Sequence, residues 1–222
     1  MNLKNLFALL TLIAALSCGV SENAFAQEKQ SAPKFNAELE KDFQKGSGGD
    51  EAALARAVKA ADEILAINPK NAETLVWRGA AGLSQAGKAF QSGNFAEGGE
   101  FWQKALDNMK SAVEIAPDNI SIRMIRASAL STAAKQFPAP EVARELRETA
   151  VTDYEKVLTL ISGNFKAMSE KQRQQILSGL ADAYDKFGDK TKARVFYRRL
   201  VEETSEAGKT RETALEWLKA NN

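Results

Sequence analysis

The chain has 222 residues, and its 30 lysine and arginine residues nearly balance its 29 aspartate and glutamate residues. A nucleic-acid-binding protein is usually basic, so this balance argues against that class. The sequence has no histidine and a single cysteine, Cys18, which excludes Ser-His-Asp and Cys-His catalysis and removes the usual ligands of zinc and haem sites. We therefore expect no enzyme, no metal and no cofactor.

Residues 1–26 have the pattern of an export signal. Lys4 gives a positive start, and the apolar run Leu6–Leu16 is too short to span a bilayer. Ala24-Phe25-Ala26 has the small-x-small form of a cleavage site. We expect cleavage after Ala26 and a periplasmic or secreted protein.

Lipidation is the alternative. Ala15-Leu16-Ser17-Cys18 resembles a lipoprotein signal, although leucine is expected where Ala15 stands. Only in that case would the protein be attached to a membrane, through Cys18.

Residues 27–50 predict a flexible tether and a short leading helix. The helix is expected from Phe35 to Gln44, because Phe35, Leu39 and Phe43 fall on one helical face. A glycine-rich stretch, 46–49, should end it, and Asp50 should cap the helix that begins at residue 51.

Residues 51–222 predict a helical repeat domain without β-structure, because no stretch alternates with a period of two. After the helix that begins at residue 51, further helices are expected over 72–91, 95–115, 119–137, 141–161, 169–187, 189–205 and 209–220. Ser92-Gly93-Asn94 predicts a turn, and Pro140 suits a first helical turn. Ser169 with Gln172 predicts a capping box.

Four of these helices share an apolar stripe that opens with an alanine. The alanines are Ala57, Ala105, Ala150 and Ala193, at steps of 48, 45 and 43 residues. Three of the stripes end in a joint of the form Pro/Ser-x-Asn, which stops one helix and caps the next. A repeated unit of this size that cannot bury its stripe alone indicates a stacked helical array.

The repeat resembles the tetratricopeptide repeat, in which a helix with a glycine and an aromatic is followed by a helix with an alanine and an aromatic and a closing proline. The clearest match is 180–189 as first helix and turn, with Ala193, Phe196 and Tyr197 in the second helix. The chain departs from the family in its period, because the family's repeat is about 34 residues long. It also has Arg78 at a position where the family prefers leucine. The period alone would also fit HEAT or armadillo repeats.

The resemblance implies an all-α fold, an antiparallel helix-hairpin array (a tetratricopeptide-like α-solenoid) of about three to four repeats. The helix over 209–220 would be its C-terminal cap, with Leu215 and Leu218 covering the open end.

The resemblance also implies a binding groove lined by the first helices of successive units. Its candidate residues here are Val76, Trp77, Ala80, Leu83, Met124, Ser128, Ser131, Asp182 and Asp185. One family subtype holds a peptide carboxylate with lysine and asparagine where this chain has Val76 and Ala80, so a carboxylate clamp is not expected. Small residues at one end and acidic residues at the other suit a helix or an extended segment. The alternative is that the small residues serve helix packing alone.

Charged clusters have two interpretations. The Arg123 and Arg126 pair, and the group at 194, 198 and 199, suggest either an anionic partner or surface pairing, for instance between Arg198 and Glu202. The carboxylate pairs Glu97/Glu100 and Asp182/Asp185 suggest either ion binding or a solvated helix face.

Three functional hypotheses follow. The leading one is an exported, non-enzymatic scaffold that binds another envelope or secreted protein through the groove or the long hairpin over 72–115. The second is binding of a small apolar or lipid-like ligand between the long helices. The third is a hydrolase that uses carboxylates, which would need a deep pocket with two of them.

Overall fold

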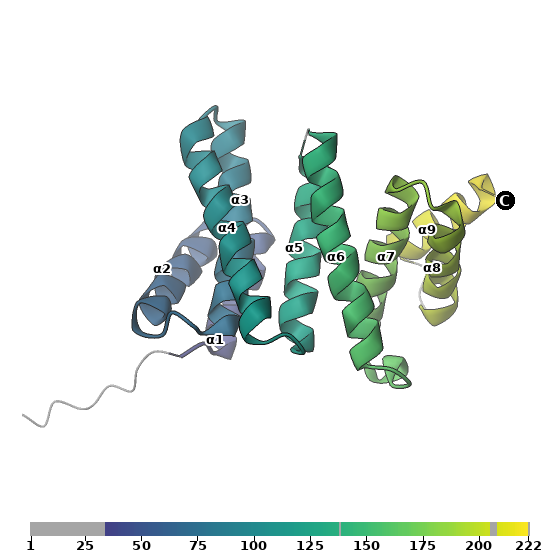
Figure 1. Ribbon diagram of the computed structural model, residues 1–222, viewed down its shortest axis with the longest axis horizontal. Coiled ribbons are helices and arrows are strands. Elements are labelled where there is room, and N and C mark those ends of the chain that lie inside the picture. The colour runs from purple at the N-terminus through teal and green to yellow at the C-terminus, as the bar shows by residue number, and fades with distance from the viewer. Residues whose placement is uncertain (1–33, 138, 205–207, 222) are drawn as a thin grey trace, which may run out of the picture. The chain divides into compact units, whose positions relative to one another are not determined.

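The computed structural model describes residues 34–137, 139–204 and 208–221. These residues form helices and no strands, which confirms the predicted all-α class (Figure 1). In chain order the elements are α1 (Ala37–Ser47), α2 (Glu51–Ile67), α3 (Ala72–Gln91), α4 (Phe95–Ile115), α5 (Ile120–Gln136), α6 (Pro140–Leu160), the 3-10 helix η1 (Phe165–Ala167), α7 (Glu170–Lys186), α8 (Lys190–Glu203) and α9 (Lys209–Ala220). The expected export signal, Cys18 and nearly all of the tether lie outside the described residues.

The predicted helix starts are set by side-chain caps. The Asp50 carboxylate accepts a hydrogen bond from the Ala53 amide at 2.9 Å, and the Asn119 side chain accepts one from the Ile122 amide at 3.1 Å. Ser169 and Gln172 form the predicted capping box. Each of these caps satisfies an amide that the first turn of a helix leaves unpaired.

The leading helix differs from its prediction. It begins at Ala37, capped by Asn36, and continues through Gly46 and Ser47 instead of ending at residue 44. Gly46 remains helical because α2 lies directly against it: a Cβ there would lie 2.8 Å from the Cβ of Leu54. The glycine thus serves close packing of the first hairpin, and Gly48 caps the helix. The 3-10 helix η1 was not predicted either.

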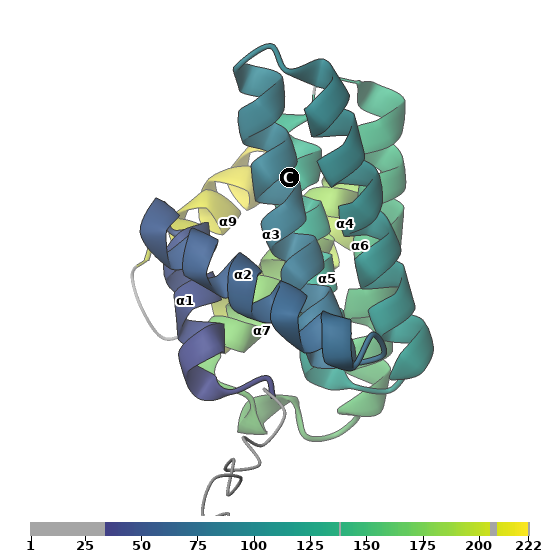
Figure 2. The same ribbon diagram turned by 90° about the vertical axis from the view of Figure 1, so that its left-hand side faces the viewer.

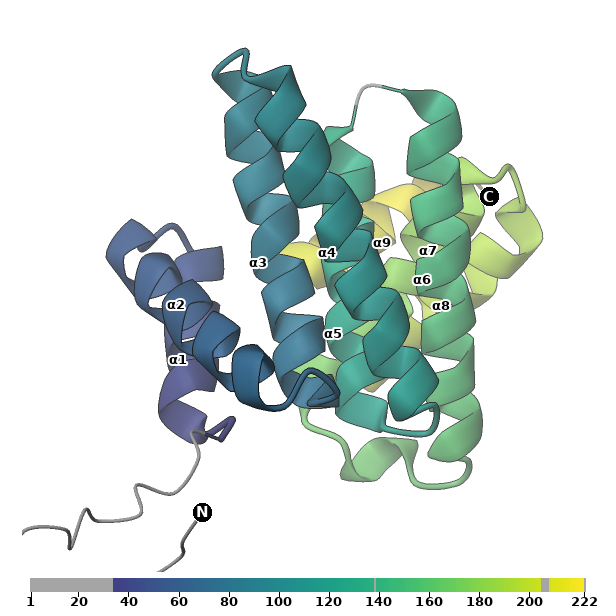
Figure 3. The same ribbon diagram turned by 60° about the vertical axis from the view of Figure 1, so that its left-hand side comes forward.

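Consecutive helices pair into four hairpins, α1–α2, α3–α4, α5–α6 and α7–α8 (Figures 1 and 2). Each hairpin touches the next one through its first helix, so that α3 contacts α1 and α5, and α5 contacts α7. The second helix of each of the first three hairpins also contacts the first helix of the following one. The hairpins therefore meet their neighbours in chain order, as Figure 3 shows from another side.

The α3–α4 hairpin closes around small residues, as the alanine that opens each stripe predicted. A Cβ on Gly79 would lie 2.5 Å from Cγ of Met109 and 2.8 Å from the carbonyl oxygen of Ala105. A Cβ on Gly82 would lie 2.9 Å from the Cβ of Ala105. The two helix backbones approach this closely only because two glycines of α3 face one alanine of α4.

Two apolar cores lie inside the hairpins. The smaller one fills the first hairpin, around Phe43 and Ile64, and the larger one runs from α3 to α9. Trp77 of α3 packs against both, with its ring stacked on Phe43 at a centroid distance of 5.6 Å.

Helix α9, the last helix of the described residues, packs on α8. Trp217 stacks on Tyr197 at 4.5 Å, and its indole nitrogen donates to Asp185 at 2.8 Å. Of the two leucines expected to cover the end, Leu218 packs on the core, whereas Leu215 is exposed, so that part of the prediction is wrong. Ala214 takes the buried place on α9. No helix in the described part of the chain is both long and apolar enough to cross a membrane.

Candidate functional site

The predicted groove residues fall into two groups. The side chains of Val76, Leu83 and Met124 are buried in the larger core, so a partner would reach them only by displacing neighbouring helices. The others keep part of their surface: Trp77, Ala80, Ser128, Ser131, Asp182 and Asp185. Only this second group can form an accessible surface.

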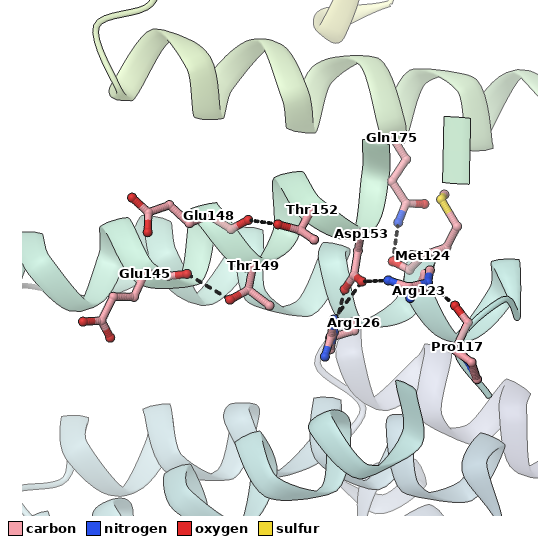
Figure 4. A network of polar contacts seen from close by, with 10 residues as sticks. All are labelled: Pro117, Arg123, Met124, Arg126, Glu145, Glu148, Thr149, Thr152, Asp153 and Gln175. Carbon is pink, nitrogen blue, oxygen red and sulfur yellow. Dashed lines mark hydrogen bonds and ion pairs between the residues drawn. The ribbon is translucent and has the colours of Figure 1, made fainter. Parts of the chain in front are cut away.

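The serines of α5 lie against a buried tyrosine. Tyr154 of α6 is 1 % exposed, and its hydroxyl lies within hydrogen-bonding reach of Ser131, Gln175 and Ser128. The Gln175 amide nitrogen also donates to the carbonyl of Met124 at 3.4 Å (Figure 4). These serines of α5 therefore lie beside a polar joint between α5, α6 and α7, and both keep part of their surface exposed.

The acidic end of the predicted groove is occupied by partners from the chain itself. Asp182 lies 3.8 Å from the ammonium of Lys135, and Asp185 accepts hydrogen bonds from Lys190 and Trp217. Burial alone would raise the pKa of the Asp185 carboxyl, but these two hydrogen bonds, together with the positive charges of Lys190 and Lys186, hold the pKa below its ordinary value. Asp185 is thus an ionised acceptor that holds α9 in place.

Arg123 and Arg126 share one buried carboxylate, that of Asp153 on α6 (Figure 4). A terminal guanidinium nitrogen of Arg123 lies 2.6 Å from Oδ1 of Asp153, and its Nε donates to the carbonyl of Pro117 at 2.5 Å. Arg126 binds the carboxylate through two nitrogens, at 2.6 and 2.8 Å. The Asp153 side chain is fully buried, so this is an internal ion triad that ties the α4–α5 joint to α6.

Neither interpretation weighed for this arginine pair describes the triad, which is not a surface pair and offers no free cation to an anionic partner. Sequence reasoning also missed Asp153 itself. A signal was present, because Asp153 sits among Ala150, Tyr154 and Val157 on the buried stripe of its helix. A carboxylate on such a stripe requires a cationic partner inside the fold.

Two arginines of the second group are also engaged within the chain, whereas Arg198 is exposed and makes no ion pair within the described residues. Arg199 pairs with Glu203 at 3.4 Å, in place of the expected pairing one residue earlier, and its guanidinium lies 5.0 Å above the ring of Phe165. Arg194 donates to the carbonyl of Asn221. These contacts join α8 to η1 and to the end of α9.

An open groove of about 780 Å³ lies between α2 and the later turns of α3. Leu54, Ala55 and Val58 of α2 give it apolar walls, and the Lys88–Glu51 ion pair, 2.7 Å long, crosses its end. No residue of this groove belongs to the predicted site. The groove forms where the first hairpin meets the second, and the spacing of the repeats in the sequence does not predict which side chains line that contact.

Within the described residues no group of three or more histidine, cysteine, aspartate or glutamate side chains is arranged to hold a metal ion. No protein-family model matches the chain, and no curated protein has a matching sequence. The site is therefore interpreted from its own geometry.

We expect the three tyrosines of the chain to ionise late in the folded protein. Burial raises the pKa of Tyr154 and of Tyr197 to about 12, and burial with a hydrogen bond to Glu155 raises that of Tyr184. The neutral forms are thus favoured by folding. The contribution of Tyr154 to stability is complete below its unfolded pKa near 10 and is lost as pH rises toward 12, at up to about 1.4 kcal/mol per pH unit.

Tyrosinate absorbance against pH measures this directly. In the native protein the titration should show no component near pH 10, whereas in concentrated urea all three tyrosines should ionise there. A native titration with an ordinary tyrosine component would contradict the burial that the structure assigns to these rings.

Proposed function

We propose that the protein is an exported, non-enzymatic scaffold that binds a partner polypeptide on a tetratricopeptide-like helical array. The observation that carries the proposal is the order of packing, in which each hairpin meets the next through its first helix, from α1 to α3, α5 and α7. Such stacking is what a repeat of this kind requires, because the apolar stripe of one unit is buried by its neighbour. The Asn71 and Asn119 caps at equivalent joints support the same register.

The proposed contact surface consists of the partly exposed residues Ala80, Ser128, Ser131, Asp182 and Asp185, which we call the first-helix face. They lie on α3, α5 and α7, three helices that touch in succession. Their side chains are small at the α3 end and acidic at the α7 end, where Lys135, Lys190 and Trp217 already contact the two carboxylates. Such a surface suits a helix or extended segment with a small apolar stretch, and a basic end would compete with these internal partners.

Binding of a small apolar ligand between the long helices has less support. The α3–α4 contact is filled at Gly79, where even a methyl group would meet Met109 and Ala105. A ligand there would have to separate two helices whose backbones are in close contact.

Export rests on the pattern of residues 1–26, and we propose cleavage after Ala26, with lipidation at Cys18 as the alternative. The mass of the mature protein from its native source separates the two, since the first gives a chain that begins at Gln27 and the second a lipid-bearing chain that begins at residue 18.

Photo-crosslinking in the native cell tests the scaffold proposal. A probe at Thr132, an exposed residue one turn beyond Ser128 on α5, reaches the first-helix face without disturbing the core. A matched probe at Glu148, exposed on α6, is the control. We expect one recurrent protein adduct from Thr132, weakened by Asp182→Lys, and none from Glu148. Probes that react with no protein, or equally from both positions, would refute the proposal.

A further inference from the structure

Four aromatic rings gather where the α3–α4 and α5–α6 hairpins turn. The Phe90 and Phe95 centroids lie 6.4 Å apart, Phe90 and Phe137 meet edge-on at 6.2 Å, and Phe137 lies 4.6 Å from Trp102. We call these four residues, from α3, α4 and the end of α5, the aromatic tip. Aromatic side chains, phenylalanine included, are enriched in the cores of protein interfaces.

The tip is closely packed in its inner part and open at Phe95. A Cβ on Gly98 would lie 2.5 Å from the Phe90 ring, so the glycine is what allows this ring to approach α4 so closely. Gly93 in the preceding turn has φ +78°, a conformation that glycine adopts without strain. Phe95 then starts α4 with 71 % of its surface exposed, the largest value among the exposed large hydrophobic residues of the described chain. Its packing on Phe90 does not cover it.

The charge beside the tip is acidic. Glu97 and Glu100 are both exposed in the first turns of α4. Glu97 accepts a hydrogen bond from the neutral side chain of Asn94 at 2.6 Å, and Glu100 makes no ion pair within the described residues. Of the neighbouring lysines, Lys88 pairs with Glu51 and Lys135 with Asp182. Lys104, one turn beyond Glu100, is exposed and forms no ion pair within the described residues. An exposed phenylalanine thus stands beside two carboxylates, neither of which is held in an ion pair in the described part of the chain.

We propose that the aromatic tip is a second docking surface, for a polypeptide that offers an apolar pocket to Phe95 and lysine or arginine side chains to Glu97 and Glu100. The inference rests on the proposed scaffold function, because it takes the partner to be a protein, but it names a different surface. Complementary charge at the rim of an apolar anchor steers association and fixes its register.

The same charges disfavour the other occupants. An anionic lipid surface would meet two carboxylates beside the anchor, and like charges repel. In a symmetric pair of copies, the same patch faces itself, so Glu97 and Glu100 of each copy would lie near their counterparts. A basic polypeptide is the partner that satisfies both the ring and the carboxylates.

Fluorine NMR on the purified full chain tests the inference. One sample carries 4-fluorophenylalanine at position 95, and a control sample carries it at Ile67, which is exposed at the far end of α2. The probes are a short helical peptide of leucine and lysine, the same peptide with glutamate in place of lysine, vesicles of phosphatidylcholine with phosphatidylglycerol, and dilution of the protein itself.

The expected result is a saturable shift at position 95, and none at position 67, with the lysine peptide alone. Glu97→Gln with Glu100→Gln should weaken this binding by about tenfold or more. A response to vesicles or to dilution would identify a lipid surface or a second copy and overturn the proposal. An equal response to both peptides, or none to any probe, would also overturn it. The crosslinking from Thr132 reports only on the first-helix face. A negative fluorine NMR result would therefore leave the scaffold proposal standing. A negative crosslinking result would leave the aromatic tip to be judged by the fluorine NMR experiment.

Discussion

Asp153→Ala is expected to lower the free energy of unfolding by about 3–5 kcal/mol, the usual cost of removing one partner from a buried ion pair. The variant leaves the guanidinium groups of Arg123 and Arg126 with little exposure and no counter-ion. The cost therefore comes mainly from two desolvated cations, and less from the attraction that is lost. Urea unfolding at neutral pH measures it.

A surface pair with the same geometry is the control. Arg56 binds Asp42 through two nitrogens, at 2.7 and 3.0 Å, but its side chain is 59 % exposed. Asp42→Ala should cost much less than Asp153→Ala, because water solvates the freed guanidinium. Similar losses in the two variants would show that burial of the triad does not set its energetics.

The triad also makes a prediction about its complete removal. If Arg123, Arg126 and Asp153 are replaced together by methionine, methionine and leucine, much of the stability lost in Asp153→Ala should return, since apolar residues of similar volume often replace buried ions without loss. Recovery of stability in the triple variant would mean that the triad does not add to the free energy of unfolding and that its role is to fix how α5 packs on α6.

The second large effect is expected from two glycines of one helix. Gly79→Ala should destabilise the protein by about 1–3 kcal/mol, because its methyl group would force Met109 and the Ala105 backbone aside. Gly87→Ala, two turns further along α3, has no atom within 4 Å of the new methyl group. It should stabilise the helix by about 0.5–1 kcal/mol, since alanine loses less backbone entropy than glycine.

Thermal unfolding of the two variants beside the parent protein tests this contrast. The opposite signs follow from tertiary contact alone, because the change in chemistry and the host helix are the same. Stabilisation by both substitutions would mean that α3 and α4 lie further apart than the structure places them.

Local signals predicted most of the helices. The bounds of α3, α4 and α9 agree with the sequence patterns residue for residue. Asparagine caps, a Ser-Gly-Asn turn and the lack of proline determine where these helices begin and end, and each depends only on residues close by in the sequence. The capping box at Ser169 belongs to the same class. The prediction of α1 was less accurate. Gly46 suggested a break in the helix, whereas in the structure this glycine allows close contact with Leu54 of the next helix.

The candidate site was harder to predict because exposure depends on the neighbouring hairpins. Val76 and Met124 occupy the positions that a repeat alignment assigns to a groove, yet both are buried. The Asp153 triad joins residues 27 and 30 positions apart, and no local period reports such a pairing. The aromatic tip likewise requires Phe137 of one hairpin to meet Trp102 of another.

The smaller core of the first hairpin has a consequence for the order of unfolding. Its buried residues come from α1, α2 and a single position of α3, Ala81, and Trp77 provides a further link to the larger core. In arrays where each unit contacts only its neighbours, a terminal unit can open while the rest stays folded. The amides of α1 and α2 should then exchange with solvent through an opening of their own, which would make the first hairpin a separate cooperative unit.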